Sequence, residues 1–219
     1  MLEKFFKEFI KTNNLINDVK NLFIKFDKIN ILEHSERVCN KAVHLAEKFY
    51  VDKDKAIVSS YLHDISGIIK NEDRIIVAES LNLEILDEER EFPLIIHQKL
   101  SKIIAKDIFC INDVDILQAI SCHTTLHKNP SKLDMILFIS DKIEWDQKDK
   151  PPYLKIIEEN LHISLEKGVS AFVKYLMSEN GNLRIIHPWL KDANDYFNEM
   201  EYETVLTQNY ENDIYNLSR

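Results

Sequence analysis

The sequence places a histidine and an aspartate side by side, His63 and Asp64, at the end of a stretch with helical periodicity. Neighbouring residues on a helix point about 100° apart, so both side chains can reach one ion only if both lean toward the same cavity. The small residues Ala56 and Ser60 precede them on the same face and leave room for a bound group. An isolated pair of this kind is more often structural, with the histidine hydrogen-bonded to a neighbour and the aspartate ending the helix.

Further histidines and a second aspartate change that balance. Each histidine lies on the apolar stripe of a different stretch with helical periodicity, and the second aspartate ends the strongly apolar run 135–139. A lone histidine on an apolar face is usually a hydrogen-bonded core residue. Several together are harder to explain in this way, because each buried polar group without a partner costs roughly 1–3 kcal/mol. The candidate metal ligands are therefore His34, His63, Asp64, His97, His123 and Asp141.

The chemistry of this set favours a catalytic metal site. Imidazole and carboxylate ligands without cysteine suit iron, manganese or zinc. Six such ligands suffice for two ions if one carboxylate bridges, and Asp64 is the natural bridge because it adjoins His63. Two ions about 3.5–4 Å apart hold a hydroxide and stabilise the attacking and leaving oxygens of a phosphoryl displacement. We therefore predict a dinuclear centre with His63 and Asp64 as its catalytic residues.

The elements that position these residues are predicted to be helices. With 3 glycines and 5 prolines in 219 residues, the chain has too little turn punctuation for many short strands, so we expect an all-α protein with one core. Residues 187–189 are predicted to form a turn, the acidic run 87–91 a solvated loop or helix start, and the tail after residue 201 a frayed end. We expect two helices within 1–30, broken near 12–14, and further helices at 31–49, 53–65, 93–108, 153–161, 164–177 and 191–201. Gly67 would stop the helix 53–65, and Pro93 would lie in the first turn of the helix 93–108. Two more helices would run from a cap at Asn112 or Asp113 to His123, and from a capping box at Ser131 through Asp141.

Charge and cysteine content limit the partners. The 28 Lys and Arg against 37 Asp and Glu give a net charge of −9, which argues against nucleic acid or an anionic membrane surface as a partner. Cys39, Cys110 and Cys122 show no paired spacing, and we interpret Cys122 as a core residue. We find neither a secretory leader nor about 18 uninterrupted apolar residues, so we expect a cytoplasmic location.

The order of these residues resembles a known superfamily. His34, the pair His63-Asp64, and Asp141 are similar to the signature of the HD-domain metal-dependent phosphohydrolases, and His97 and His123 match the extra histidines of its dinuclear members. The resemblance is closest to the YqeK-type proteins, which are associated with symmetrical hydrolysis of diadenosine tetraphosphate to two ADP. It rests on the segments His34-Ser35-Glu36-Arg37-Val38, Leu62-His63-Asp64, Ile120 to His123-Thr124-Thr125, and Ser140-Asp141-Lys142-Ile143-Glu144.

This resemblance implies an HD-domain helical bundle at residues 31–178. Helical extensions would occupy 1–30 and 179–219, and the first of these is also a candidate contact in a homodimer. The chain departs from the YqeK pattern at Gly67, where those proteins usually carry a lysine, and after Glu144, where Trp145 and its neighbours replace a proline and an arginine. Lys70 could take the role of the missing lysine if the loop folds back.

Site roles follow from the same resemblance. One ion is assigned to His34, His63, Asp64 and Asp141, and the other to Asp64, His97 and His123. The ions are two divalent or mixed-valence transition metals, with iron preferred and manganese or zinc as alternatives, and the bridging hydroxide is the nucleophile. The candidate substrate-binding residues are Arg37, Lys70, Thr124, Lys132 and Lys142, although each cation alone is more often a solvated surface charge.

The expected partner is a small-molecule nucleotide. Segment 146–152 would form one wall of its groove, and Trp145 could stack on a base, although a bulky residue ending a core helix explains that tryptophan equally well. Two other functions remain open. One is an HD phosphohydrolase acting on nucleoside monophosphates or alarmones, and the other is a metal-containing helical binding protein without turnover.

Overall fold

The computed structural model describes residues 2–12, 14–144 and 149–217, with side chains described to residue 203. Within these ranges every regular element is a helix, so the all-α prediction is confirmed. The elements are α1 (Glu3–Phe6), α2 (Leu15–Lys25), α3 (Ile29–Phe49), α4 (Lys53–Leu62), η1 (Ile65–Ile68), η2 (Asn71–Asp73), α5 (Arg74–Ser80), α6 (Asp87–Glu91), α7 (His97–Asp107), α8 (Val114–Cys122), α9 (Lys132–Ile143), α10 (Leu154–Leu161), α11 (Leu165–Met177), η3 (Glu179–Gly181) and α12 (Pro188–Leu217).

Helix α9 is the centre of the fold. Every residue from 133 to 140 is buried, as expected for a helix that is apolar on nearly all sides. It packs against α3, α4, α8 and α11, and the buried apolar residues form one core that extends from Leu2 to Phe197. Asp141 follows this buried run directly, so its carboxylate lies at the edge of the core, where α3 and α4 meet α9.

Local side-chain caps fix where the central helices begin. The Asp113 carboxylate accepts from the backbone N–H groups of Asp115 and Ile116 at the start of α8. At the start of α9, Ser131 and Asp134 form the reciprocal bonds of a capping box. Such caps satisfy backbone donors that a helix leaves free at its N-terminus. Both caps confirm the predicted starts, with Asp113 rather than Asn112 as the cap of α8.

The end of α4 differs from the prediction. The helix stops at Leu62, before the His63-Asp64 pair, and Gly67 lies inside η1 rather than acting as a helix stop. Its φ angle is not positive. A Cβ at this position would lie 2.4 Å from Cδ1 of Ile31, so Gly67 serves the close approach of η1 to α3.

The start of α7 also differs. Helix α7 begins at His97, four residues after Pro93, and the acidic run forms the short α6. Phe92, which precedes the proline, has φ −129° and ψ 79°, outside the α-helical region that a following proline disfavours. The next backbone bonds, Ile95 to Phe92 and His97 to Leu94, span three residues and therefore form tight turns rather than an α-helix.

The helices at the two ends of the chain depart from their predicted lengths in opposite directions. The first helix, α1, is only four residues long, whereas α2 begins after Asn14 as predicted. Helix α12 is longer than predicted, because residues 187–189 do not form a separate turn and the expected frayed tail continues as helix to Leu217. Pro188 suits a first helical position, and the sequence from 189 to 217 contains neither glycine nor proline to end the helix.

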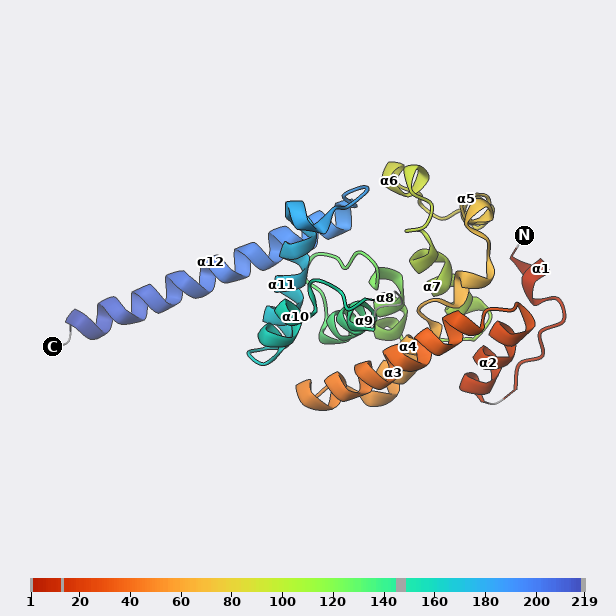
Figure 1. Ribbon diagram of the computed structural model, residues 1–219, viewed down its shortest axis with the longest axis horizontal. Coiled ribbons are helices and arrows are strands. Elements are labelled where there is room, and N and C mark those ends of the chain that lie inside the picture. Colours follow the sequence, from red (N-terminus) through yellow and green to blue (C-terminus); the bar gives the residue numbers. More distant parts are fainter. Residues whose placement is uncertain (1, 13, 145–148, 218–219) are drawn as a thin grey trace.

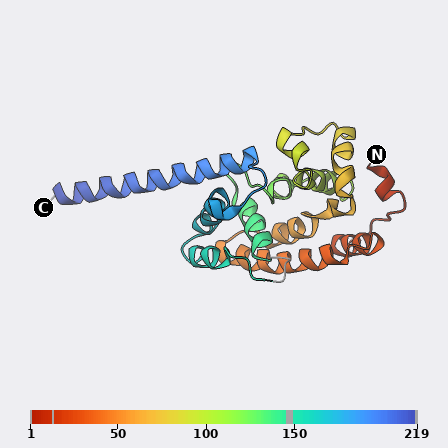
Figure 2. The same cartoon turned by 45° about the horizontal axis from the view of Figure 1, so that its top comes forward.

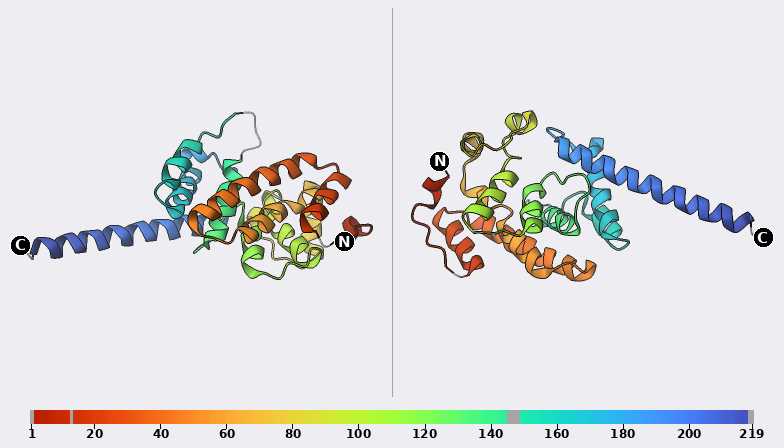
Figure 3. Two further views of the ribbon diagram at one scale, coloured as in Figure 1. Left: turned by 90° about the horizontal axis from the view of Figure 1, so that it is seen from below. Right: turned by 180° about the vertical axis from the view of Figure 1, so that it is seen from behind.

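Helix α12 projects beyond the other helices, on the side away from the N-terminus (Figures 1, 2 and 3). Its first part packs against α11, and Leu190, Ala193 and Phe197 join the core. Among the described elements, no helix is both long enough and apolar enough to cross a lipid bilayer.

Candidate metal centre

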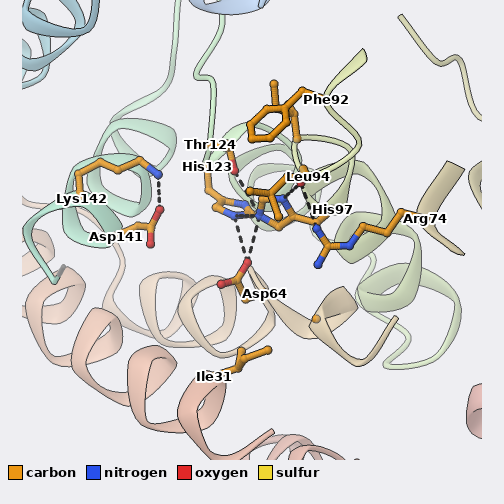
Figure 4. A pocket seen from close by; sticks show the side chains of 12 residues that line it. Ile31, Asp64, Arg74, Phe92, Leu94, His97, His123, Thr124, Asp141 and Lys142 are labelled. Carbon is orange, nitrogen blue, oxygen red and sulfur yellow. Dashed lines mark hydrogen bonds and ion pairs between the residues drawn. The ribbon is translucent and has the colours of Figure 1, made fainter. Parts of the chain in front are cut away.

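Five helical segments bring the six predicted ligands together. His34 projects from α3, His63 and Asp64 follow α4, His97 opens α7, His123 follows α8, and Asp141 lies in the last turn of α9. Figure 4 shows Asp64, His97, His123 and Asp141 around one cavity. The stripes predicted for these histidines therefore face a common centre.

The first group of ligands lies where α3, α4 and α9 meet. The Nε2 atom of His34 is 2.9 Å from Oδ1 of Asp141, and Nε2 of His63 is 3.8 Å from the same oxygen. The potential ligand atoms of these three residues all lie within 4.8 Å of one another. This spacing suits one ion.

The second group lies on the other side of Asp64. Oδ1 of Asp64 is 3.1 Å from Nε2 of His97 and 3.5 Å from Nε2 of His123, whereas Oδ2 is 3.5 Å from Nε2 of His63. The two oxygens of one carboxylate thus face different histidines. This arrangement suits a carboxylate that bridges two ions through its two oxygens.

Backbone carbonyls fix the orientation of three of the histidine rings. The Nδ1–H groups of His63, His97 and His123 each donate to the carbonyl three residues earlier, at 2.7, 2.6 and 2.8 Å respectively. A carbonyl oxygen can only accept, so Nδ1 carries the proton in each neutral ring and Nε2 presents a lone pair. A hydrogen bond from the other ring nitrogen to a backbone carbonyl is typical of histidines that bind metals.

Two features of the Nε2 atoms are difficult to explain without a ligand. Nε2 of His63 is buried without a hydrogen-bond partner among the described residues. Nε2 of His97 and Nε2 of His123 lie 2.9 Å apart, and with the proton of each ring on Nδ1 the two atoms direct lone pairs at each other. A shared cation removes both problems. The residues present therefore fit a transition-metal centre.

The charges of the site also suit cation binding. Burial raises the pKa of Asp64, but His63, His123 and His97 outweigh this effect and hold it well below its usual value. Burial likewise raises the pKa of Asp141, and Lys142, His34 and His63 lower it far more. Burial lowers the pKa of His123 to about 4, although its hydrogen bond to Asp64 acts in the opposite direction. At neutral pH both carboxylates are therefore ionised, and His123 is neutral.

A cavity of about 310 Å³ opens beside these groups. Its polar lining includes Asp64, His97, His123, Asp141 and two of the predicted substrate-binding residues, Thr124 and Lys142. The Thr124 hydroxyl lies 3.3 Å from Nε2 of His97, and Nζ of Lys142 lies 2.5 Å from Oδ2 of Asp141. Its apolar lining consists of Ile31, Phe92, Leu94 and Ile95.

The other predicted substrate-binding cations are not part of this lining. Lys70 is exposed beside Glu72, Lys132 is exposed with Nζ near the Phe49 carbonyl, and Arg37 has Nε 4.0 Å from Glu144. Trp145 and residues 146–148 lie outside the described part of the chain, so the predicted groove wall is not described there.

A cation that the sequence analysis missed does line the cavity. Arg74, the first residue of α5, has its guanidinium beside Asp64 and His97 (Figure 4). A signal for this was present in the sequence. Arg74 precedes the buried residues Val77 and Ala78 by three and four positions, which places it on the inward face of that helix.

Another group of potential ligands has a structural explanation. Cys122, His127 and Asp134 also place potential ligand atoms within 4.8 Å of one another. However, Nε2 of His127 lies 3.1 Å from Asp134, whose carboxylate also caps α9, and burial raises the pKa of Cys122 well above its usual value. We interpret Cys122 as a core thiol and His127 as the ion-pair partner of Asp134.

The HD domain family model matches residues 31–146, more than half of the chain and a range that contains all six candidate ligands. The chain belongs to the HD-domain family. The resemblance found in the sequence is thereby confirmed, and this protein is an HD-domain hydrolase.

Similar proteins support the same family. An uncharacterized protein in the pepC 5′ region of Lactococcus lactis subsp. cremoris is 43% identical over 144 residues, covering 66% of this chain and 73% of the relative. A symmetrical bis(5′-nucleosyl)-tetraphosphatase of Bacillus subtilis (strain 168) is 26% identical over 151 residues, covering 67% and 80% respectively. A crystal structure of an HD superfamily hydrolase of Clostridium acetobutylicum, described as involved in NAD metabolism, has a TM-score of 0.73 at 25% identity and covers 87% of this chain and 99% of that one.

Proposed function

We propose that this HD-domain hydrolase cleaves a phosphoanhydride of a nucleotide, and that its substrate is diadenosine tetraphosphate, which it converts to two ADP. The observation that carries the proposal is the position of Asp64, whose two oxygens face different histidines beside a cavity. The cationic side chains of Arg74 and Lys142 also line this cavity. The names of the Bacillus relative and of a Staphylococcus aureus relative, 32% identical over 116 residues, support this choice of substrate.

In this proposal, His34, His63, Asp64 and Asp141 hold one metal ion, and Asp64, His97 and His123 hold the other. Two such ions, with iron preferred and manganese or zinc as alternatives, would activate water and neutralise the charge that develops on the phosphoryl oxygens. Because Asp64 contributes to both positions, we assign it the central role, with His63 beside it as the second catalytic residue.

The surrounding residues would orient the histidine rings and keep the carboxylate of Asp141 ionised. The carbonyls of Ser60, Leu94 and Ile120 hold the imidazole rings so that Nε2 faces the centre. Lys142 keeps Asp141 ionised, and the Thr124 hydroxyl, beside His97, is placed to donate to a phosphoryl oxygen. Ile31, Phe92 and Leu94 add apolar surface to the wall of the cavity.

Symmetrical cleavage sets a requirement for space. Water adds to the second phosphorus from one nucleoside, and the bond from that phosphorus to the oxygen that it shares with the third phosphorus breaks. This oxygen leaves with the other half of the molecule as ADP, and the attacked half becomes the second ADP. The cavity of about 310 Å³ is near the lower limit for ligand sites and cannot enclose both halves. At least one nucleoside must therefore lie outside it.

The same volume favours a second candidate function. A nucleoside monophosphate is close to the size that this cavity can enclose, so a mononucleotide phosphohydrolase is the alternative.

The three cysteines are unpaired, which supports the proposed location in the reducing cytoplasm.

A turnover panel decides between these functions. Purified protein loaded with iron or manganese is incubated with diadenosine tetraphosphate, with nucleoside monophosphates and with alarmones, and the products are separated by anion exchange. The proposal predicts ADP as the sole product from diadenosine tetraphosphate. AMP plus ATP would indicate asymmetric attack, rapid phosphate release from a mononucleotide would favour the alternative, and no turnover by the metal-loaded protein would favour a binding function.

A further inference from the structure

Arg74 is a buried cation in the wall of the candidate metal centre. Its side chain starts from α5, outside the helices that carry the candidate ligands, and only 8% of the residue is exposed. The guanidinium reaches the cavity that Asp64, His97 and His123 line (Figure 4). An arginine at such a depth requires an explanation, since arginine is almost never fully buried unless it is paired.

The protein pairs this guanidinium incompletely. Nη1 donates to the Leu94 carbonyl at 3.2 Å, and Nε is buried without a hydrogen-bond partner. No carboxylate within the described residues forms an ion pair with Arg74. Asp64 is close enough to favour the charged form, but its oxygens already face His63, His97 and His123.

Burial lowers the pKa of Arg74 and the nearby Asp64 acts against this effect. Arginine side chains stay protonated in proteins, so the guanidinium carries its charge here. A buried charge that lacks a counter-ion is costly. The missing partner must be an anion that enters the cavity, and the planar fork of a guanidinium matches the oxygens of a phosphoryl group better than any neutral ligand.

Two neighbouring positions contribute no positive charge to this wall of the cavity. Gly67 lines the cavity but has no side chain. Lys70, the replacement suggested by the sequence, is exposed beside Glu72 and does not line the cavity.

We propose that Arg74 forms an anion subsite beside the metal centre, which binds a second phosphoryl group of the substrate while the first is held at the metal ions. The inference deepens the proposed function and rests on it for the identity of the substrate. A ligand with one phosphoryl group would use the metals alone, whereas a ligand with two adjacent groups would also engage Arg74. The subsite therefore selects diphosphate and longer chains over monophosphates.

Binding of two small probes tests this subsite without any turnover. Metal-loaded protein, freed of excess metal, is titrated calorimetrically with methylenediphosphonate, a non-hydrolysable diphosphate analogue, and separately with inorganic phosphate. In Arg74→Gln we expect methylenediphosphonate to bind about tenfold to a hundredfold more weakly, because a bidentate charge-assisted contact is lost, and inorganic phosphate to change less than about threefold. Arg74→Lys should be intermediate, because it keeps the charge but loses the fork.

Arg90→Gln is the matched control, since Arg90 is exposed and pairs with Glu79 on the surface. It should bind both probes as the unaltered protein does. Metal content and the thermal unfolding midpoint are recorded for each variant, and Arg74→Lys decides the outcome if Arg74→Gln does not fold. Equal weakening of both probes, or no weakening of methylenediphosphonate, would overturn the subsite. Failure to cleave diadenosine tetraphosphate would remove the proposed function but leave this binding difference intact.

Discussion

Two buried clusters of charged and imidazole side chains differ in how completely their polar atoms are paired. One is the candidate metal centre, and the other joins Glu89 of α6, Lys99 of α7 and His187 just before α12. Glu89 is fully buried, and its Oε2 accepts from Lys99 at 2.8 Å and from the Leu86 backbone at 2.9 Å. Its Oε1 lies 3.4 Å from Nε2 of His187, whose Nδ1 accepts from the backbone of Trp189.

The comparison separates a structural cluster from a functional one. In the Glu89 cluster, both carboxylate oxygens and both imidazole nitrogens have partners, so the cluster is complete without a ligand. In the candidate centre, Nε2 of His63 has no partner within the described residues, and Nε2 of His97 faces Nε2 of His123. Buried polar groups in proteins are normally satisfied, so the candidate centre is a cluster that a cation would complete.

The largest effect is expected from removing the shared carboxylate of the centre. Asp64→Asn keeps the shape of the side chain but cannot bridge two cations, so metal content should fall toward zero and hydrolysis by at least about 1,000-fold. Metal analysis by mass spectrometry and the turnover panel measure both. Asp54→Asn on the exposed surface of α4 is the control. Full activity of Asp64→Asn would show that Asp64 is not the bridge.

A change in the Glu89 cluster should affect stability instead of metal content. Glu89→Gln removes the buried negative charge and leaves the ammonium group of Lys99 without a counter-ion, which typically costs about 3–5 kcal/mol of unfolding free energy. Urea denaturation of the metal-free protein measures this loss, with the exposed Glu91→Gln as control. If metal binding declined as steeply as in Asp64→Asn, the two clusters would not be functionally distinct.

The features that sequence analysis predicted depend on residues close together in the chain. The inward stripe of His97 and Leu100 is set by helical spacing, and the capping box of Ser131 and Asp134 spans four residues. The buried run before Asp141 shows in composition alone. The structure brings all six candidate ligands together, whereas their binding of metal stays a prediction.

The features that it missed depend on contacts between distant segments. Glu89 belongs to the acidic run predicted as a solvated loop or a helix start. The run does form the short helix α6, but Glu89 itself is buried, and its partner His187 lies 98 positions away. Arg74 is held by the carbonyl of Leu94, 20 positions away. Periodicity carries no information about such pairs. The start of α7 was predicted too early because the turns after Pro93 contain the same apolar residues as a helix.

The smallest effect is expected at the ion pair of His127 and Asp134. This pair is less enclosed than the Glu89 cluster. His127 resembles His187 in facing a single carboxylate, but 24% of its side chain is exposed, so it can exchange protons with solvent. The hydrogen bond to Asp134 raises the pKa of His127, although burial acts against it. The raised value means that the folded protein binds the proton more tightly than the unfolded chain does.

The sign of the resulting pH dependence follows from this difference. The contribution of the pair is fully present below the unfolded pKa of about 6.5 and is lost as the pH rises through the higher folded pKa. His127→Gln should therefore lower the unfolding free energy by less than about 1 kcal/mol at pH 5.5, given its partial exposure, and by still less at pH 8.5. Urea denaturation at several pH values measures the difference, with the exposed His44→Gln as control. A gap that widened with rising pH would mean that His127 is not the protonated partner of Asp134.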